Sequence, residues 1–211
     1  MNVLLDEAVT CTDGAPLEVV DAVVDPRTRT VTNVVIRPHR ASSLARLVPV
    51  QHLEEHPGGL RLALDLEAFN QLPMATEVAF VRLDELPSAD AGDTSGSERV
   101  AAFPYVGAGP SDRVTVIRGL LPEGNVELRR TSRVVTADGR VIGRVEAIHC
   151  DGDDAITAVL VRTGRVFGRR QVAIPIEQVD AIANDTVTVN IPKAVVRDLP
   201  RAAAARGRDV G

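Results

Sequence analysis

Hydrophobic and polar residues alternate over most of this chain, and a period of two is typical of a half-buried β-strand. The clearest example is residues 134–148, VVTADGRVIGRVEAI, where two alternating segments flank an Asp-Gly pair. This arrangement predicts a tight hairpin with a primed turn, because glycine accepts the positive φ that such a turn requires. Residues 9–23, VTCTDGAPLEVVDAV, form a weaker copy of the pattern. The predicted structural turn residues are Asp13, Gly14, Asp138 and Gly139.

The two hairpins belong to a longer repeat. A further β-rich segment follows each of them, VTNVVI in the first copy and ITAVLV in the second. Asp13 and Asp138 are 125 positions apart (138 − 13), and the same offset joins Ile36 to Val161 (161 − 36), so no gap is needed between the copies. A repeat of this length indicates an internal duplication. We therefore expect an all-β chain that folds into two small β-barrels.

The composition divides the chain into four segments. Residues 1–80 and 114–197 each contain one copy of the repeat and are predicted to form one barrel each. Residues 81–113 between them are rich in Ser, Asp, Gly and Pro, which predicts a flexible linker. Such a linker suggests that the barrels move independently, at least in part. Residues 198–211 are expected to be a disordered tail.

Each barrel is expected to have a core of branched aliphatic side chains and to end with a short helical turn. The chain is 45% hydrophobic but only 2% aromatic, and such side chains suit small barrel interiors. The helical turns are predicted at residues 67–72, before Pro73, and at residues 192–199, where proline is the first residue. The low aromatic content argues against a nucleic-acid platform that stacks bases on aromatic faces.

The net charge of −5 is unevenly distributed. Residues 1–80 carry 6 basic and 11 acidic residues, a net −5, whereas residues 114–197 carry 12 and 10, a net +2. An acidic first half argues against a chain that clamps a phosphate backbone along its whole length. We find no basic region of a signal peptide and no apolar run near the length of about 18 residues that a membrane helix needs. We expect a cytoplasmic protein. Its single lysine among 24 basic residues is typical of a GC-rich, bacterial genome.

Three short motifs could in principle serve catalysis or metal binding, and each has a structural explanation. HLEEH at residues 52–56 matches the inverted zincin pattern, but Pro-Gly-Gly follows at once and ends any helix. DGDD at residues 151–154 suits a hard cation, yet the chain returns to strand without the closing Glu of an EF-hand. Cys150 follows His149, but neighbouring strand residues point to opposite faces. With Cys11 it makes no disulfide framework. We expect no enzyme activity, no cofactor and no metal.

The best candidate contact surface is a pair of loops at equivalent places in the two copies, residues 38–47 and 163–170. Arginine clusters bind anions, but they also keep a barrel soluble and protect its edges, and both readings stay open here. The residues predicted to bind a partner are His39, Arg40 and Arg46 around the first loop, and Arg162, Arg165, Phe167, Arg169 and Arg170 around the second.

After its Asp-Gly turn the second copy has Ile-Gly-Arg-Val at residues 142–145, then an acidic turn, a β-rich strand and Ile-Pro-Ile at residues 174–176. Together these motifs resemble the PRC-barrel family. The likeness covers about residues 9–72 and 128–192. Gly143 is a further expected structural residue of the hairpin, and the first copy departs from the pattern with Glu18 there. The family includes the cytoplasmic domain of the photosynthetic reaction-centre H subunit and the C-terminal domain of the rRNA-processing factor RimM.

The resemblance implies two PRC-type β-barrels with a non-enzymatic, protein-binding role. We expect an interaction or adaptor module whose partner is an unidentified protein or a second copy of the chain. The alternative is a ribosome or RNA-processing accessory factor that contacts RNA or a ribosomal protein through the Arg162–Arg170 loop. Salt distinguishes the two, since phosphate contacts weaken steeply as ionic strength rises. We expect no membrane insertion.

Overall fold

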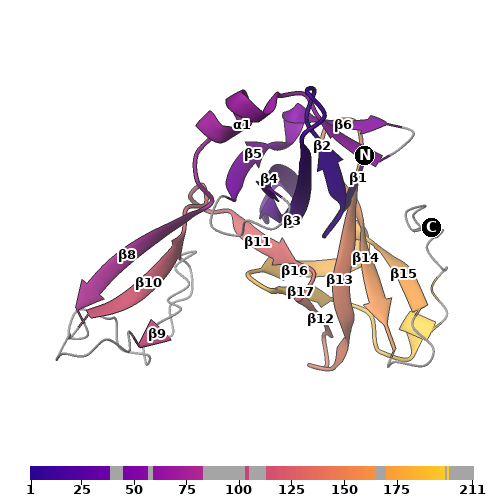
Figure 1. The fold of residues 1–211 in the computed structure, drawn as a ribbon. Coiled ribbons are helices and arrows are strands. Elements are labelled where there is room, and N and C mark those ends of the chain that lie inside the picture. The colour runs from indigo at the N-terminus through magenta and orange to yellow at the C-terminus, as the bar shows by residue number, and fades with distance from the viewer. Residues whose placement is uncertain are drawn as a thin grey trace.

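The computed structural model describes residues 1–38, 45–56, 59–82, 103–104, 113–164, 170–197 and 199. Two seven-stranded sheets make up most of this part of the chain (Figure 1). The only α-helix among the described residues is α1 (Leu66–Gln71). The predicted all-β class with two small barrel-like units is confirmed.

Sheet 1 is built mainly from the first copy of the repeat. Its strands follow the order β5-β4-β3-β2-β7-β6, and β11 also pairs with β3. These strands are β2 (Ala8–Thr10), β3 (Pro16–Asp25), β4 (Thr30–Pro38), β5 (Arg46–Pro49), β6 (Leu53–His56), β7 (Gly59–Leu62) and β11 (Val126–Arg129).

Sheet 2 is built mainly from the second copy and has the same strand order, β15-β14-β13-β12-β17-β16, with β1 also paired to β13. These strands are β1 (Asn2–Leu4), β12 (Arg133–Thr136), β13 (Val141–Cys150), β14 (Ile156–Thr163), β15 (Arg170–Pro175), β16 (Val179–Ala183) and β17 (Thr186–Val189).

A short helical turn follows the last strand of each repeat copy, β7 and β17, as predicted. α1 comes after β7 and is capped by Asp65, whose side chain accepts a hydrogen bond from the N–H of Ala68 at 2.8 Å. Such a cap satisfies a backbone donor that the first turn leaves free. The 3₁₀ helix η5 (Val195–Arg197) comes after β17, and two more 3₁₀ helices, η2 (Val50–His52) and η4 (Ile176–Gln178), follow β5 and β15.

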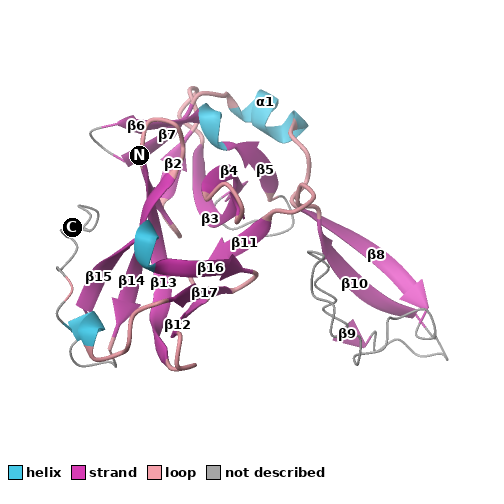
Figure 2. Ribbon diagram, turned by 180° about the vertical axis from the view of Figure 1, so that it is seen from behind, coloured by secondary structure: helices cyan, strands magenta, loops and turns pink. Residues whose placement is uncertain are grey.

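The strand that immediately precedes each Asp-Gly hairpin is incorporated into the sheet of the other copy. β1 runs antiparallel to β13 with Val3 opposite Ile148, and β11 runs antiparallel to β3 with Leu128 opposite Ala22. All four side chains are fully buried. The exchange is reciprocal, so each sheet includes a strand that belongs to the other copy (Figures 1 and 2).

The two sheets also meet at the turns that follow β3 and β13. Thr30 forms an isolated antiparallel bridge with Ala155. On either side, the N–H of Val31 donates to Asp154 O at 3.0 Å and the N–H of Ile156 donates to Arg29 O at 2.8 Å. One continuous core cluster contains buried residues of both sheets. The structure therefore differs from the expectation of independently moving barrels, because shared strands and a shared core couple the two units.

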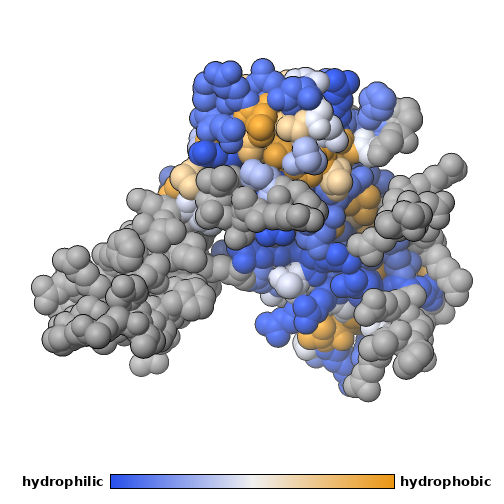
Figure 3. All heavy atoms as spheres, viewed as in Figure 1, coloured by the Kyte–Doolittle hydropathy of each residue, from blue (hydrophilic) through white to orange (hydrophobic). Residues whose placement is uncertain are grey.

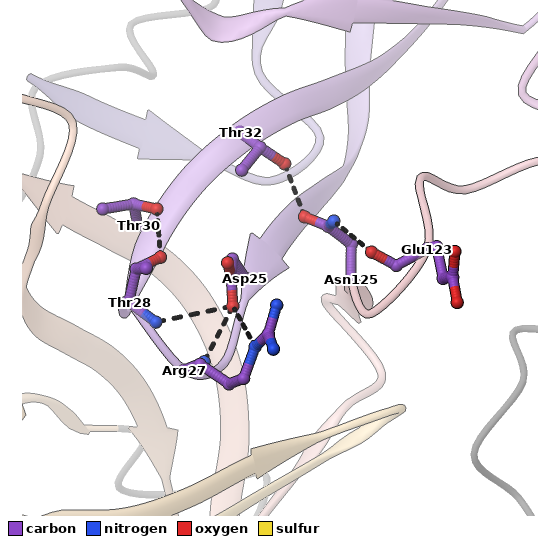
Figure 4. Close-up of polar contacts among 7 residues, drawn as sticks. All are labelled: Asp25, Arg27, Thr28, Thr30, Thr32, Glu123 and Asn125. Atoms are coloured by element: carbon purple, nitrogen blue, oxygen red, sulfur yellow. Dashed lines mark hydrogen bonds and ion pairs between the residues drawn. The ribbon is translucent and has the colours of Figure 1, made fainter.

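Side-chain hydrogen bonds fix the turn between β3 and β4 and attach the segment before β11 to it (Figure 4). Asp25 Oδ1 accepts hydrogen bonds from the backbone N–H of Arg27 at 2.8 Å and of Thr28 at 3.4 Å. The bond from Arg27 is the main reason that the pKa of the Asp25 carboxyl lies below its ordinary value. Thr32 Oγ1 donates to Asn125 Oδ1 at 2.8 Å, which ties the approach to β11 to sheet 1.

Both Asp-Gly sequences form hairpin turns, but the predicted primed turn is wrong. The N–H of Gly14 donates to Cys11 O at 3.0 Å, and the N–H of Gly139 donates to Thr136 O at 2.8 Å. The two glycines have φ of +86° and +76°, whereas neither preceding aspartate has a positive φ. A three-residue loop with glycine in the left-handed region fits these bonds and angles. Glycine is needed at both places, and the aspartates are ordinary turn residues.

The two copies differ by one residue within β3 and β13. Val19 lies opposite Ile36 and Val145 opposite Val161, so the offset is 126 in the first strand (145 − 19) but 125 in the second (161 − 36). Ile142 is left unpaired where the register of β12 and β13 shifts. Five residues separate the paired Cys150 and Ile156, whereas six separate the equivalent pair Val24 and Val31. The prediction that no gap is needed is wrong, because an insertion and a deletion cancel along the chain.

Gly143 lies inside β13, beside this bulge, rather than in the turn. A Cβ at this position would lie 2.4 Å from the carbonyl oxygen of Arg162 and 2.8 Å from a methyl of Val161. Glycine within a strand often marks such a close approach of another backbone. Gly143 is thus required by the packing of β14 against β13.

A third, three-stranded sheet extends away from the other two (Figures 1 and 2). It consists of β8 (Thr76–Arg82), β9 (Phe103–Pro104) and β10 (Arg113–Gly119). Strand residues 81–82, 103–104 and 113 fall within the predicted linker 81–113; its other residues lie outside the described part of the chain. The predicted tail 198–211 also lies outside it, apart from Leu199, which is buried. The segment boundaries stay predictions.

Candidate functional site

Three of the predicted partner-binding residues can be placed in the structure. Arg46 begins β5, Arg162 lies near the end of β14, and Arg170 begins β15. The loops that they border are at equivalent places in the two sheets, as the sequence suggested. The predicted residues that lie outside the described part of the chain are His39, Arg40, Arg165, Phe167 and Arg169.

In sheet 1 the outer edge of β5 is covered by the segment that follows α1. The N–H of Leu47 donates to Pro73 O at 2.9 Å, and the N–H of Ala75 donates to Ala45 O at 3.0 Å. Arg46 takes part in this contact, because its Nη1 donates to Leu72 O at 3.0 Å. The edge is therefore occupied by the chain itself, and Arg46 has a structural role there.

In sheet 2 the corresponding edge belongs to β15. Ala173 lies opposite Leu160, the position that Leu47 holds opposite Val35 in sheet 1. The N–H of Ala173 therefore faces away from β14, like that of Leu47. No described residue bonds to the outward-facing backbone of Ala173 or of Gln171. Within the described part of the chain, β15 presents an uncovered edge.

Arg170 is held by the chain at the start of β15. Its Nη2 donates to Leu199 O, and its own carbonyl oxygen accepts a hydrogen bond from Thr163 Oγ1 at 3.1 Å. These contacts connect the ends of the Arg162–Arg170 loop to the segment after η5. Arg170 is thus a structural residue in addition to a predicted contact residue.

Arg162 belongs to a row of three arginines that the sequence analysis did not identify. It lies directly opposite Arg144 on β13, and Arg144 lies directly opposite Arg133 on β12. Directly opposite residues share one face of a sheet. Arg133 and Arg144 are exposed and Arg162 is half-buried. We call Arg133, Arg144 and Arg162 the arginine row; only the strand register brings them together.

The same row in sheet 1 is electrically balanced. Its positions are Ala8, Glu18 and Arg37, which are paired across β2, β3 and β4. Arg37 Nη2 lies 3.1 Å from Glu18 Oε2, and Arg37 Nε donates to the same oxygen at 3.2 Å. The formal charge of the row is therefore zero in sheet 1 and +3 in sheet 2. The net charges of −5 for residues 1–80 and +2 for residues 114–197 indicated this local difference only weakly.

The two motifs that could bind a metal ion form ordinary parts of the sheets and turns. HLEEH at residues 52–56 runs from the end of η2 into β6, so its histidines do not share a helical face. Asp151 Oδ1 accepts hydrogen bonds at 3.0 Å from the N–H groups of Asp153 and Ala155, which shapes the turn after β13. The described residues contain no group of three or more His, Cys, Asp or Glu side chains placed to hold a metal ion.

Cys150 and His149 are separated by the pleat of β13. Cys150 is buried and lies opposite Ile156, whereas His149 is half-buried and lies opposite Ala158. Burial raises the pKa of the Cys150 thiol to about 12. Burial also lowers the pKa of the His149 imidazole. The thiol is therefore protonated at neutral pH and lacks the thiolate character that a nucleophile needs.

The described surface is largely polar. Figure 3 shows hydrophilic residues over much of one face, with hydrophobic residues in smaller groups. Among the described residues, the exposed large hydrophobic side chains are Met74, Leu120, Val141 and Val195. None of the described helices has the length and apolar character that spanning a bilayer would require.

Comparison with known proteins finds one family model that matches part of the chain, within the second unit. No curated protein matches the chain. Residues 130–196 match the family model of the PRC-barrel domain. This range contains β12 to β17 and most of η5, so it holds the uncovered edge of β15 and the whole arginine row. Residues 130–196 are therefore similar to a PRC-barrel domain.

Proposed function

We propose that this protein is a non-enzymatic protein–protein interaction module built from two PRC barrels. The second barrel is the matched domain, and we infer that residues 1–80 provide the first. The equal strand order of the two sheets and the reciprocal pairing of β1 and β11 support this inference. An adaptor role in the cytoplasm remains part of the proposal.

The observation that carries the proposal is the outer edge of β15, which no described residue covers. An exposed strand edge offers backbone donors and acceptors to a strand of a partner. The equivalent edge of β5 is closed by the residues after α1 through bonds such as Leu47 N–H to Pro73 O. Among the described residues, the two barrels thus differ at the place where a partner strand would add. We place the partner strand along β15, beside Gln171 and Ala173.

The test is an affinity pull-down with the full chain as bait, with recovered protein and RNA analysed separately after low-salt and high-salt washes. Ala173→Pro removes the outward-facing N–H of β15, and proline is tolerated at strand edges. We expect a salt-resistant protein partner with the wild type that is lost with Ala173→Pro and kept with Lys193→Glu, a change at an exposed residue after β17. Dimers seen by light scattering, and abolished by Ala173→Pro, would identify a second copy as the partner.

Two results would contradict the proposal. One is a protein partner that binds Ala173→Pro as tightly as the wild type, provided that the melting temperature of the variant is close to that of the wild type. The other is recovery of RNA without protein, with release at high salt. That second result would favour the ribosome or RNA-processing role, because phosphate contacts are strongly salt-dependent.

A further inference from the structure

The arginine row crosses three neighbouring strands of sheet 2 and ends one strand short of β15, the edge strand that no described residue covers. Arg133, Arg144 and Arg162 occupy adjacent strands, and Arg162 in turn lies opposite Gln171 on β15. Adjacent strands are about 4.8 Å apart, so the outer two Cα atoms are separated by about 10 Å. Thr186 on β17 lies beside Arg133 at the other end. The row thus places three positive charges side by side between two neutral polar residues, Thr186 and Gln171.

The row is unfavourable for the isolated fold. Like charges that lie directly opposite on neighbouring strands repel one another. Among the described residues, no carboxylate lies within 4.0 Å of the three guanidinium groups, although Glu146 follows on the same strand as Arg144. Sheet 1 avoids this repulsion with Glu18 at the position of Arg144. The arginine row therefore has positive charge that the fold does not compensate, and binding sites are expected at such places.

We propose that the arginine row binds the acidic face of a helix in a partner protein. The inference rests on the proposed function and adds the chemistry of the partner. Guanidinium groups form bidentate hydrogen bonds with carboxylates. Carboxylates one turn apart on a helix are spaced by about 5.4 Å along its axis, close to the strand spacing of about 4.8 Å. On an extended strand, side chains of one face are about 6.7 Å apart, a poorer match.

The rest of the chain favours a protein over a nucleic acid as the occupant. The chain is 2% aromatic and carries a net charge of −5. Nucleic-acid platforms that hold single strands use aromatic faces to stack bases, and a net negative chain repels a phosphate backbone at long range. A helix laid across the strands would also reach the edge of β15, where the proposed partner strand adds. One partner could then contact both features.

The test uses fluorescence anisotropy with the full chain and three labelled peptides. The probe is an alanine-based helical peptide with Glu at positions i, i+4 and i+7, which places three carboxylates on one face. One control peptide has Gln at those positions, and the other has the same three Glu residues spread around the helix. A single-stranded RNA of 12 nucleotides is the fourth probe. The variants are Arg144→Glu, which copies the Glu18 arrangement, and Lys193→Glu, which changes the charge equally at an exposed residue outside the row.

We expect the one-face Glu peptide to bind at low salt, and Arg144→Glu to weaken its binding by about tenfold or more. Lys193→Glu should keep the wild-type affinity within about twofold, since exposed charges outside the contact contribute little. The Gln peptide and the spread-Glu peptide should bind at least about fivefold more weakly than the one-face peptide. Arg144→Glu should melt at or above the wild-type temperature, which separates lost binding from lost folding.

Several results would overturn the inference. They are equal binding of the one-face and spread-Glu peptides, equal effects of Arg144→Glu and Lys193→Glu, no peptide binding at low salt, or tighter binding of the RNA than of the peptide. The proposed function is tested separately. If the partner captured from cells is lost with Ala173→Pro but kept with Arg144→Glu, the interaction module stands and the acidic-helix inference fails.

Discussion

Arg144 on β13 lies directly opposite Arg162 on β14, at the place where Glu18 and Arg37 form an ion pair in sheet 1. Replacing Arg144 by Glu should therefore exchange a repulsion for an attraction and raise the free energy of unfolding by about 0.5–1 kcal/mol. Urea denaturation at low salt measures this change. The gain should shrink in high salt, which screens exposed charges. A destabilised Arg144→Glu variant would contradict the repulsion.

The exchanged strand β1 should be essential for the stability of sheet 2. Val3 is fully buried opposite Ile148, so Val3→Ala should lower the free energy of unfolding by about 2 kcal/mol. Val141→Ala is the matched control, since that side chain is 49% exposed, and should change stability by less than about 0.5 kcal/mol.

We expect a single unfolding transition for both sheets in urea, because the core is continuous. Two separate transitions would show that the units are not coupled.

Gly143→Ala should be strongly destabilising. The new Cβ would lie 2.4 Å from the carbonyl oxygen of Arg162, a backbone atom that moves only if β14 moves. We expect a loss of about 2–3 kcal/mol in the free energy of unfolding, as for overpacked cores. Gly152→Ala is the control, because a Cβ there meets no atom within 4 Å and its φ is not positive. Similar unfolding midpoints for the two variants would refute the close approach.

The stability of the protein should fall in alkaline solution in a way that depends on Cys150. Burial raises the pKa of this thiol from 9.0 to about 12, so the native state binds the proton more tightly than the unfolded state does. The resulting stability is fully present below pH 9 and is lost as the pH rises from about 9 to about 12. Urea midpoints measured between pH 8 and 11 should decline, and Cys150→Ala should flatten the decline.

A thiol reagent should modify native Cys150 slowly at pH 8, whereas rapid modification would contradict its burial.

The sequence contained enough information for the architecture and for the existence of two similar halves. Strand alternation and turn glycines are local properties, so they predicted the all-β class, the hairpins at Gly14 and Gly139, and the helical turn at 67–72. The resemblance of the second copy to the PRC-barrel family also came from local motifs, and the match over residues 130–196 agrees with it. For the candidate site, sequence reasoning identified Arg162 and its loop but missed Arg133 and Arg144.

What the sequence could not reveal depends on pairing between distant residues. The exchange of β1 and β11 leaves the alternation of both strands unchanged, because a buried Val3 looks the same whichever sheet it joins. The bulge at Ile142 is hidden because one residue fewer separates Cys150 from Ile156 than in the first copy, which restores the spacing. The arginine row exists only in the register of three strands. Local propensity determined which segments are strands; only the tertiary packing of buried faces decided which strand lies beside which, and so where charge gathers.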